Sequence, residues 1–189
     1  MINDFVALDF EFGEVKKDRI SIVEVGMQKV QDQKLTDKLS MLINPESNID
    51  SYASDNIHHI YQSDVVAAPK FGDAWAIITN FIDDNHVVVH DAKNEGRAIL
   101  SNATFYNLKV DNLVIYDTLK LAKCILPQHQ KYNIAALSKY FDLPKLIAHD
   151  ALDDAQETAQ LFIKMQNLIF EKQLQYHQIM HNVKINVNF

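Results

Sequence analysis

The sequence has few of the residues that break or cross-link a chain. Its 189 residues include one cysteine, four glycines and four prolines. The single thiol, Cys124, excludes an intrachain disulfide framework and a cysteine-rich zinc site. The scarcity of glycine and proline favours long regular elements over a loop-rich fold. At roughly 100–200 residues per domain, this length predicts one domain.

Long apolar runs are absent as well. No stretch approaches the ~18 consecutive apolar residues of a membrane-spanning helix. The first residues carry acids at positions 4, 9 and 11 and lack the basic region of a secretory signal peptide. We therefore expect a soluble, cytoplasmic protein with no membrane partner.

Basic side chains are outnumbered by acidic ones. Lys and Arg number 18 against 25 Asp and Glu, which gives a net charge of −7. This balance argues against broad, non-specific binding of nucleic acid, because proteins that bind in that way are normally basic. It is compatible with an enzyme that meets one nucleic-acid end in a small cleft, since carboxylates loaded with divalent cations present a neutral or positive site.

Hydrophobic patterning predicts a mixed α/β domain. Three β-rich runs come first, at residues 5–11, 20–30 and 38–45, and predict an antiparallel hairpin or meander. Two further strand candidates follow, at 86–90 and 112–118, separated and followed by segments of helical periodicity. We expect an α/β sandwich with a mixed five-stranded sheet and helices on both faces.

Asp9 and Glu11 are the first candidates for chemistry. Residues i and i+2 of a strand point to the same face, so both carboxylates leave the end of the first strand side by side. Open α/β sheets bind their ligands at this end of their strands. Two adjacent, poorly solvated carboxylates repel each other unless a cation lies between them. The alternative is that the strand simply ends there and both acids are solvated.

A second cluster follows the strand candidate at 86–90. The apolar residues end at His90, and Glu95 falls in the first turn of the next helix. An acid at that position is favoured by the helix dipole and needs no other role. His90 is equally well explained as a histidine of the core.

The third cluster lies before the last long helix. His149 and Asp154 are five residues apart, about 500° around a helix, so their side chains would not share a helical face. They converge only if His149 lies on the preceding loop and folds back. Asp150 is then a candidate N-cap, which is also the structural explanation of the acidic cluster.

Together the three clusters resemble the motifs of the DEDDh 3′–5′ exonucleases. The matching features are D-x-E at Asp9 and Glu11, H-x-A-x-x-E ending at Glu95, and H-x-A-x-x-D from His149 to Asp154. That family includes RNase T, the oligoribonucleases and the DnaQ-like proofreading (epsilon) subunits of bacterial DNA polymerase III. The resemblance extends from about residue 3 to about residue 164, with further similarity in IHHIYQSDV at 57–65 and YDTLKLAK at 116–123.

The resemblance implies an RNase H-like three-layer fold and two divalent ions, Mg²⁺ or Mn²⁺. Asp9, Glu11 and Asp154 correspond to direct metal ligands, with Asp9 bridging both ions. Glu95 corresponds to the acid that holds its ion largely through water, and His149 to the general base. Residues 1–165 would form the exonuclease domain, with 166–189 as its C-terminal helical extension and tail.

The sequence departs from the family pattern near the substrate. Glu95 stands where Asp is usual, and Asp91, in place of Asn, adds a carboxylate that could share the same ion. Phe12 replaces Thr and could stack on the terminal base or pack in the core. His59 replaces the glycine of the I-H-G segment, where His58 is the family's histidine. We predict substrate contacts for Phe12, His58, His90 and Asp91.

The leading hypothesis is a metal-dependent 3′–5′ exonuclease that acts on single-stranded nucleic-acid ends, DNA rather than RNA. The alternative is a catalytically impaired relative that serves as a nucleic-acid or polymerase binding module. A haloacid-dehalogenase-type phosphatase is disfavoured, because it would need D-x-D where this chain has D-x-E.

The C-terminal stretch 166–189 carries apolar residues that could contact a DNA polymerase subunit, a second copy of the chain or the protein's own core. These residues are Leu168, Ile169, Leu174, Ile179 and Met180.

Overall fold

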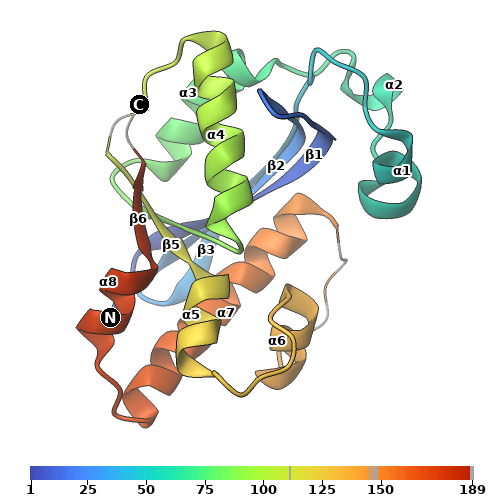
Figure 1. Ribbon diagram of the computed structural model, residues 1–189. Helices are drawn as coiled ribbons and strands as arrows, with labels where there is room; N and C mark the ends of the chain where they lie inside the picture. Colours follow the sequence, from blue (N-terminus) through green and yellow to red (C-terminus); the bar gives the residue numbers. More distant parts are fainter. Residues whose placement is uncertain (111, 145, 147–148, 188–189) are drawn as a thin grey trace.

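The computed structural model describes residues 1–110, 112–144, 146 and 149–187. Within these residues the centre of the molecule is a six-stranded mixed sheet with the order β3-β2-β1-β4-β5-β6 (Figure 1). The strands are β1 (Phe5–Val15), β2 (Ile20–Gln31), β3 (Lys34–Leu42), β4 (His86–Val89), β5 (Leu113–Asp117) and β6 (Lys184–Val187). The first three strands are antiparallel, and β4 runs parallel to both β1 and β5.

The sheet has one strand more than the predicted five. The sixth strand, β6, pairs antiparallel with β5, so that Ile185 lies opposite Ile115 and Val187 opposite Leu113. By pairing with β5, β6 satisfies backbone groups that an edge strand would leave open. The sequence of this stretch is polar and β-prone, but the prediction assigned it to a tail and did not count it in the sheet.

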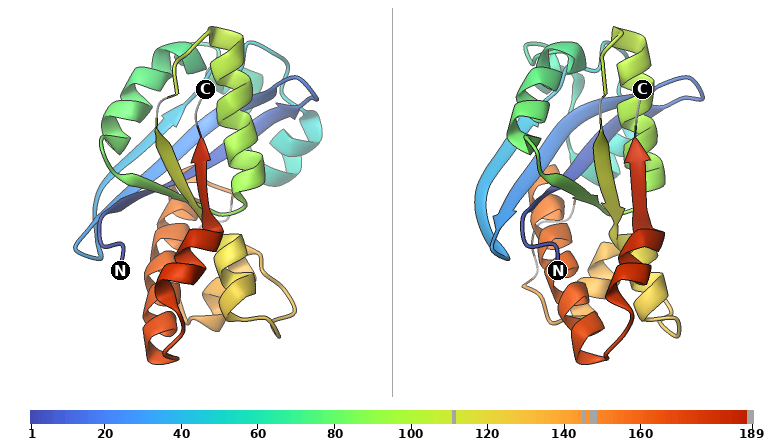
Figure 2. Two further views of the ribbon diagram at one scale, coloured as in Figure 1. Left: turned by 60° about the vertical axis from the view of Figure 1, so that its left-hand side comes forward. Right: turned by 90° about the vertical axis from the view of Figure 1, so that its left-hand side faces the viewer.

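Helices cover both faces of the sheet, as predicted. The helical elements are α1 (Ser51–Ala53), the π-helix η1 (Ser54–His58), α2 (Gln62–Val65), α3 (Phe71–Ile82), α4 (Ala92–Tyr106), α5 (Thr118–Ile125), α6 (Ile134–Tyr140), α7 (Ala151–Glu171) and α8 (Tyr176–Val183). The helices α3 and α4 pack on one face, and α5 to α8 pack on the other (Figure 2).

The alternation along β1 decides which face each side chain joins. Val6, Leu8 and Phe10 pack in the core beneath α3 and α4, whereas Phe5 and Ala7 pack in the core beneath α7. Because successive strand residues point to opposite faces, the odd-numbered residues continue toward α7. That odd-numbered series ends with Asp9 and Glu11, the D-x-E pair.

Residues beyond position 165 complete the core on the α7 side. The helix α7 continues unbroken through residues 165 and 166 to Glu171. Ile169 and Met180 are buried there, and Leu168 and Ile179 pack against the same core. Leu174 is the exception, with 37% of its surface exposed. Most of the apolar residues considered for a partner therefore cover the protein's own interior.

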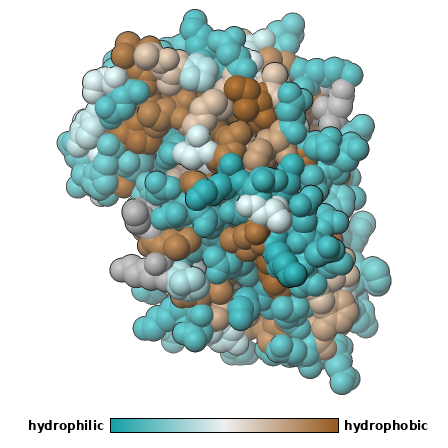
Figure 3. Space-filling view, turned by 180° about the vertical axis from the view of Figure 1, so that it is seen from behind, coloured by the Kyte–Doolittle hydropathy of each residue, from teal (hydrophilic) through white to brown (hydrophobic). Residues whose placement is uncertain are grey.

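The surface shows no continuous apolar belt on the side opposite the view of Figure 1. There the hydrophobic atoms gather mainly in the upper half, and hydrophilic residues predominate below (Figure 3). Among the described residues, no helix has the length and apolar character needed to cross a membrane.

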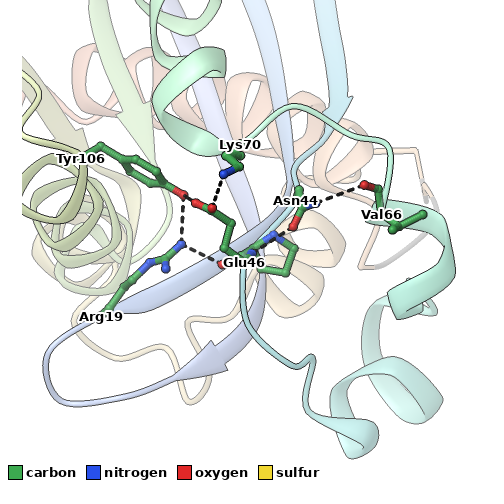
Figure 4. A network of polar contacts seen from close by, with 7 residues as sticks. Arg19, Asn44, Glu46, Val66, Lys70 and Tyr106 are labelled. Atoms are coloured by element: carbon green, nitrogen blue, oxygen red, sulfur yellow. Dashed lines mark hydrogen bonds and ion pairs between the residues drawn. The ribbon is translucent and has the colours of Figure 1, made fainter.

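A polar network fixes the connection that follows β3. The guanidinium of Arg19 donates to the carbonyl oxygen of Pro45 (2.8 Å) and to the Tyr106 hydroxyl (3.3 Å). The carboxylate of Glu46 accepts from that hydroxyl and pairs with Lys70. Figure 4 shows how these side chains converge from the residue before β2, from α4 and from the N-cap of α3. The network anchors one end of the segment that carries α1, η1 and α2.

Candidate active site

Asp9 and Glu11 lie side by side on the α7 face of β1. They are only 9% and 6% exposed. In the antiparallel register they stand opposite Gly26 and Glu24 of β2. The strand continues to Val15 after a register shift beyond Glu11, so the two acids are not solvated at a strand end. Bulges of this kind often re-aim side chains next to active sites.

Asp154 approaches the pair from the first turn of α7. The N-cap of this helix is Asp150, whose carboxylate accepts from the N–H groups of Leu152 and Asp153, both at 3.1 Å. This arrangement agrees with the capping role expected for Asp150. The first turn of α7 is therefore capped by Asp150 and directs a second acid, Asp154, toward the sheet.

Gly26 allows the helix to come that close. A Cβ atom at this position would lie 2.0 Å from the backbone carbonyl carbon of Ala151. Any side chain there would push the start of α7 away from β2, and Asp154 with it. The sequence offered no sign of this role, because the approach joins two segments far apart in the chain.

His149 lies on the loop before α7 and folds back toward Asp154. Its backbone has a left-handed φ of 63°, and its N–H donates to Asp154 Oδ2 at 3.3 Å. The structure thus meets the geometric condition that the five-residue spacing imposed. The ligand atoms of Glu11, His149 and Asp154 all lie within 4.8 Å of one another. The His149 side chain is exposed.

Glu95 reaches the same cluster from the first turn of α4. It is 4% exposed, and within the described part of the chain its buried Oε2 has no hydrogen-bond partner. Burial raises the pKa of Glu95 well above its ordinary value, and the nearby charges of Asp9 and Glu11 raise it further. A favourable interaction with the helix dipole does not explain why a buried carboxylate oxygen without a hydrogen-bond partner lies next to other acids.

The acids disfavour one another's ionisation. Burial, followed by the charge of Asp154, raises the pKa of Asp9 well above its usual range. The same two causes raise the pKa of Glu11 to about 8, and burial raises that of Asp154 to about 6. Clustered buried carboxylates with raised pKa values and an orphaned oxygen fit a divalent cation, for which hard oxygen ligands suit Mg²⁺ or Mn²⁺.

Glu24 is a further carboxylate at the site that sequence reasoning missed. It projects from β2 opposite Glu11 and accepts from the Ser40 hydroxyl (3.1 Å) and the Ala151 N–H (3.4 Å). Its charge also contributes to the raised pKa of Asp9 and Glu11. The one available signal was a charged residue inside the apolar run ISIVEVG.

A groove of about 500 Å³ opens beside Glu11. Its lining includes Phe12, Tyr52, Ile57 and His58. Phe12 is half-buried and also packs against the core on the α3 and α4 side, so both of its predicted environments meet at this residue. The predicted contact of Phe12 with a terminal base stays a prediction.

His58 is buried at the end of η1. Its Nδ1 accepts from the Ile60 N–H (3.0 Å), and burial lowers its pKa. A backbone hydrogen bond with Phe12 acts in the opposite direction and raises this pKa. His59, where the family has glycine, adopts a left-handed φ of 55°. This is a conformation that glycine adopts freely and histidine only occasionally.

His90 and Asp91 lie where β4 passes into α4. The His90 Nδ1 lies 2.8 Å from the Thr118 hydroxyl, and burial lowers its pKa. This contact favours the core interpretation of His90, and its substrate contact stays a prediction. Asp91 has a left-handed φ of 67° and accepts from the Asn94 amide (2.9 Å). Its charge raises the pKa of Glu95.

Comparison with known proteins gives consistent matches. The model of the RNase T exonuclease family matches residues 6–162. The PolC-type DNA polymerase III of Caldanaerobacter subterraneus is 30% identical over 162 residues, which cover 86% of this chain and 11% of that protein. The 3′–5′ exonuclease DinG of Staphylococcus epidermidis is 25% identical and covers 98% of this chain and 21% of that protein. The chain thus spans a small part of these curated relatives.

Among solved structures, Exonuclease X in complex with 5′ overhanging duplex DNA superposes with a TM-score of 0.73 at 26% identity. The match covers 94% of this chain and 98% of that chain.

Proposed function

Because this chain belongs to the RNase T exonuclease family and carries the DEDDh residues with Glu95 in place of one Asp, we propose that it is a metal-dependent 3′–5′ exonuclease acting on single-stranded DNA ends. The observation that carries the proposal is the convergence of Asp9, Glu11, Glu95 and Asp154 from β1, α4 and α7. Buried like charges are costly unless a cation offsets them.

The acids divide into two groups as ion ligands. Asp9, Glu11 and Asp154 would hold the two ions directly. Glu95 would hold its ion through water, and Asp91 is near enough to contribute charge. Two-ion sites of this kind supply an activated water and stabilise charge on the leaving oxygen of a phosphodiester.

His149 would accept the proton of the attacking water. Its exposed ring stands beside Glu11 and Asp154, while its backbone N–H is held by Asp154. A histidine at neutral pH can take up a proton and release it to solvent. The loop position gives the ring access both to the carboxylates and to bulk water.

The groove lined by Phe12, Tyr52, Ile57 and His58 would receive the terminal nucleotide. Aromatic rings stack on any base, so this contact would not select a sequence. The groove begins at Glu11, which would bring the terminal phosphodiester to the carboxylates.

The preference for DNA over RNA is supported by the named relatives. The curated matches include DNA polymerases of the PolC type, and the solved structure at 26% identity contains DNA. The partner expected with this reading is a single-stranded DNA 3′ end. A polymerase subunit and a second copy of the chain, bound through residues 166–189, remain predictions.

The test is degradation of a 5′-labelled single-stranded DNA and its RNA counterpart with Mg²⁺, Mn²⁺ or EDTA, beside Asp9→Ala. We expect a metal-dependent ladder that shortens from the 3′ end on DNA, is weaker on RNA and is absent in the variant. Absence of a ladder on both substrates, with folded protein and metal present, would favour the impaired, binding-only relative. The replacement of the usual Asp by Glu95 motivates that alternative.

A further inference from the structure

A second hollow, distinct from the carboxylate site, lies on the outer side of α4. It measures about 580 Å³ and runs between α4, the start of α5 and β6. Residues of α4 and β6 line it, and Figure 2 shows these two elements side by side. Its charged lining residues are Lys17, Lys93, Arg97 and Lys120. We call this hollow the α4 groove.

The charge of the α4 groove is opposite to that of the molecule. The chain has a net charge of −7, yet among the described residues that line this groove four are basic and none is acidic. Lys17, Lys93 and Lys120 are exposed. Within the described ranges no ion pair neutralises these three lysines. A concentration of unpaired cations in an acidic protein attracts polyanions to that part of the surface.

The groove is held in shape by contacts within the protein. One nitrogen of the Arg97 guanidinium donates to the carbonyl oxygens of Lys16 (2.5 Å) and Lys17 (3.3 Å). This clamp fixes the tip of the β1–β2 hairpin against α4 and places Lys17 at the rim. Leu100, Ile185 and Val187 contribute apolar surface to the lining.

Gly96 leaves the backbone of α4 open to the α4 groove. Glycine inside a helix costs stability relative to alanine. A Cβ atom at this position would meet nothing within 4 Å, so packing inside the protein does not require the glycine. The residue lines the groove, and its missing side chain leaves room for a ligand at the helix backbone.

The groove and the carboxylates lie on different sides of one helix. Lys93 and Glu95 are about 200° apart around α4, because each residue of a helix turns by about 100°. The groove nevertheless includes Ala92, the first residue of α4. A DNA strand that leaves the carboxylates and passes over the start of α4 would therefore enter the α4 groove.

We infer that the α4 groove binds the phosphate backbone of the nucleic acid several nucleotides away from the end that is cut. The inference rests on the proposed single-stranded DNA substrate and adds a second site to it. Its consequence is that affinity depends on length: a trinucleotide reaches only the carboxylates, whereas a 20-nucleotide strand also fills the groove.

The test compares binding of labelled 3- and 20-nucleotide single-stranded DNA by fluorescence anisotropy in Mg²⁺, with His149→Ala in every protein to slow hydrolysis while keeping the carboxylates that would hold the ions. One variant carries Lys17→Glu, Lys93→Glu and Lys120→Glu. The matched control carries Lys34→Glu, Lys38→Glu and Lys172→Glu, three exposed lysines outside the groove with the same change in net charge.

We expect the groove variant to bind the 20-mer at least ~10-fold more weakly than the control variant at low salt. The slope of log affinity against log salt should fall by about 0.7 for each phosphate that is no longer neutralised, or about 2 for three phosphates. Trinucleotide affinity should be equal in the two variants. An equal reduction of 20-mer affinity in both would overturn the inference.

Gly96→Leu tests the same groove without changing charge. Its side chain points into open space, so the variant should fold, as a thermal melt would verify, and should weaken 20-mer binding while sparing the trinucleotide. Unchanged 20-mer binding in a folded Gly96→Leu protein would contradict a ligand in the groove. These binding measurements do not depend on hydrolysis. A negative result in them can therefore be distinguished from a negative result in the degradation assay with the wild-type protein.

Discussion

Asp9, Glu11 and Glu95 are buried acids whose charges act on one another, and each has a raised pKa for that reason. A protein that only needed to fold would gain from replacing them with neutral residues, because burying unpaired charge is costly. Retaining them is the signature of a site whose ligand is a cation. Burial of these acids lowers the stability of the metal-free protein and keeps their carboxylates available to a cation.

The role of His149 is testable by substitution. We expect His149→Ala to lower kcat by roughly 10²–10⁴, the usual contribution of a general base, with little change in KM. Initial rates on single-stranded DNA would measure this. The control is His177→Ala, an exposed histidine of α8, which should retain wild-type rates. A His149→Ala enzyme within a factor of two of wild type would remove this residue from the mechanism.

Glu95 tests whether the site is built around the longer side chain. Its carboxylate is buried beside Asp9 and Glu11 while its backbone is fixed in α4. Shortening it by one methylene in Glu95→Asp withdraws the carboxylate by roughly 1.5 Å. We expect the rate to fall about 10-fold or more, since a 1 Å misplacement near the chemistry can cost up to about 10². Faster hydrolysis by Glu95→Asp would mean that the native residue is a handicap.

At the scale of elements, the site depends on how closely α7 approaches β2. Gly26 lets Ala151 lie against the strand, and Glu24 accepts from the Ala151 N–H at the same place. These two β2 residues position the helix terminus that carries Asp154. The clustered acids of β1 and α7 are thus brought together by a strand that contributes no residue to the D-x-E or H-x-A-x-x-D motifs.

Gly26→Ala should therefore damage stability and activity together. Its added methyl group would meet the backbone of Ala151, which cannot rotate away, so we expect a loss of about 1–3 kcal/mol, the usual cost of overpacking. The rate should fall because Asp154 moves with the helix. Chemical denaturation and initial rates would measure both. Gly96→Ala is the matched control, since its Cβ would meet nothing, and it should leave stability equal or higher.

The sequence patterns predicted the features that depend on local periodicity and residue type. The shared face of Asp9 and Glu11 follows from the two-residue period of a strand, and the N-cap role of Asp150 follows from residue type and position. The contribution of Gly26 was not predictable, because it depends on a contact with a residue more than 120 positions away. The strand β6 was missed because its pairing with β5, and not its own composition, makes it a strand.

At the scale of the whole molecule, the acids link stability to pH. For Glu11 the folded pKa is about 8 and for Asp154 about 6, both above the ordinary values of 4.5 and 3.8. The folded protein therefore binds more protons than the unfolded chain between about pH 4 and pH 8. In that window the free energy of unfolding of the metal-free protein should fall as pH rises.

We expect the metal-free protein in EDTA to melt at a lower temperature at pH 8 than at pH 5.5. A difference of about 1 kcal/mol corresponds to about 2–4 °C for a chain of this size. Addition of Mg²⁺ at pH 8 should recover the loss, because an ion bound only by the folded state stabilises it. Glu11→Gln should flatten the pH dependence. A melting temperature in EDTA that is higher at pH 8 would contradict this account of the site.

The most direct measurement is anomalous diffraction from crystals grown with Mn²⁺ and a short single-stranded DNA. The account predicts manganese peaks among the carboxylates of Asp9, Glu11 and Asp154, with the DNA 3′ end beside them, and no such peaks in Asp9→Asn crystals. Well-ordered crystals with the 3′ end bound but no manganese among these carboxylates would contradict the claim that this cluster is a metal-dependent exonuclease site.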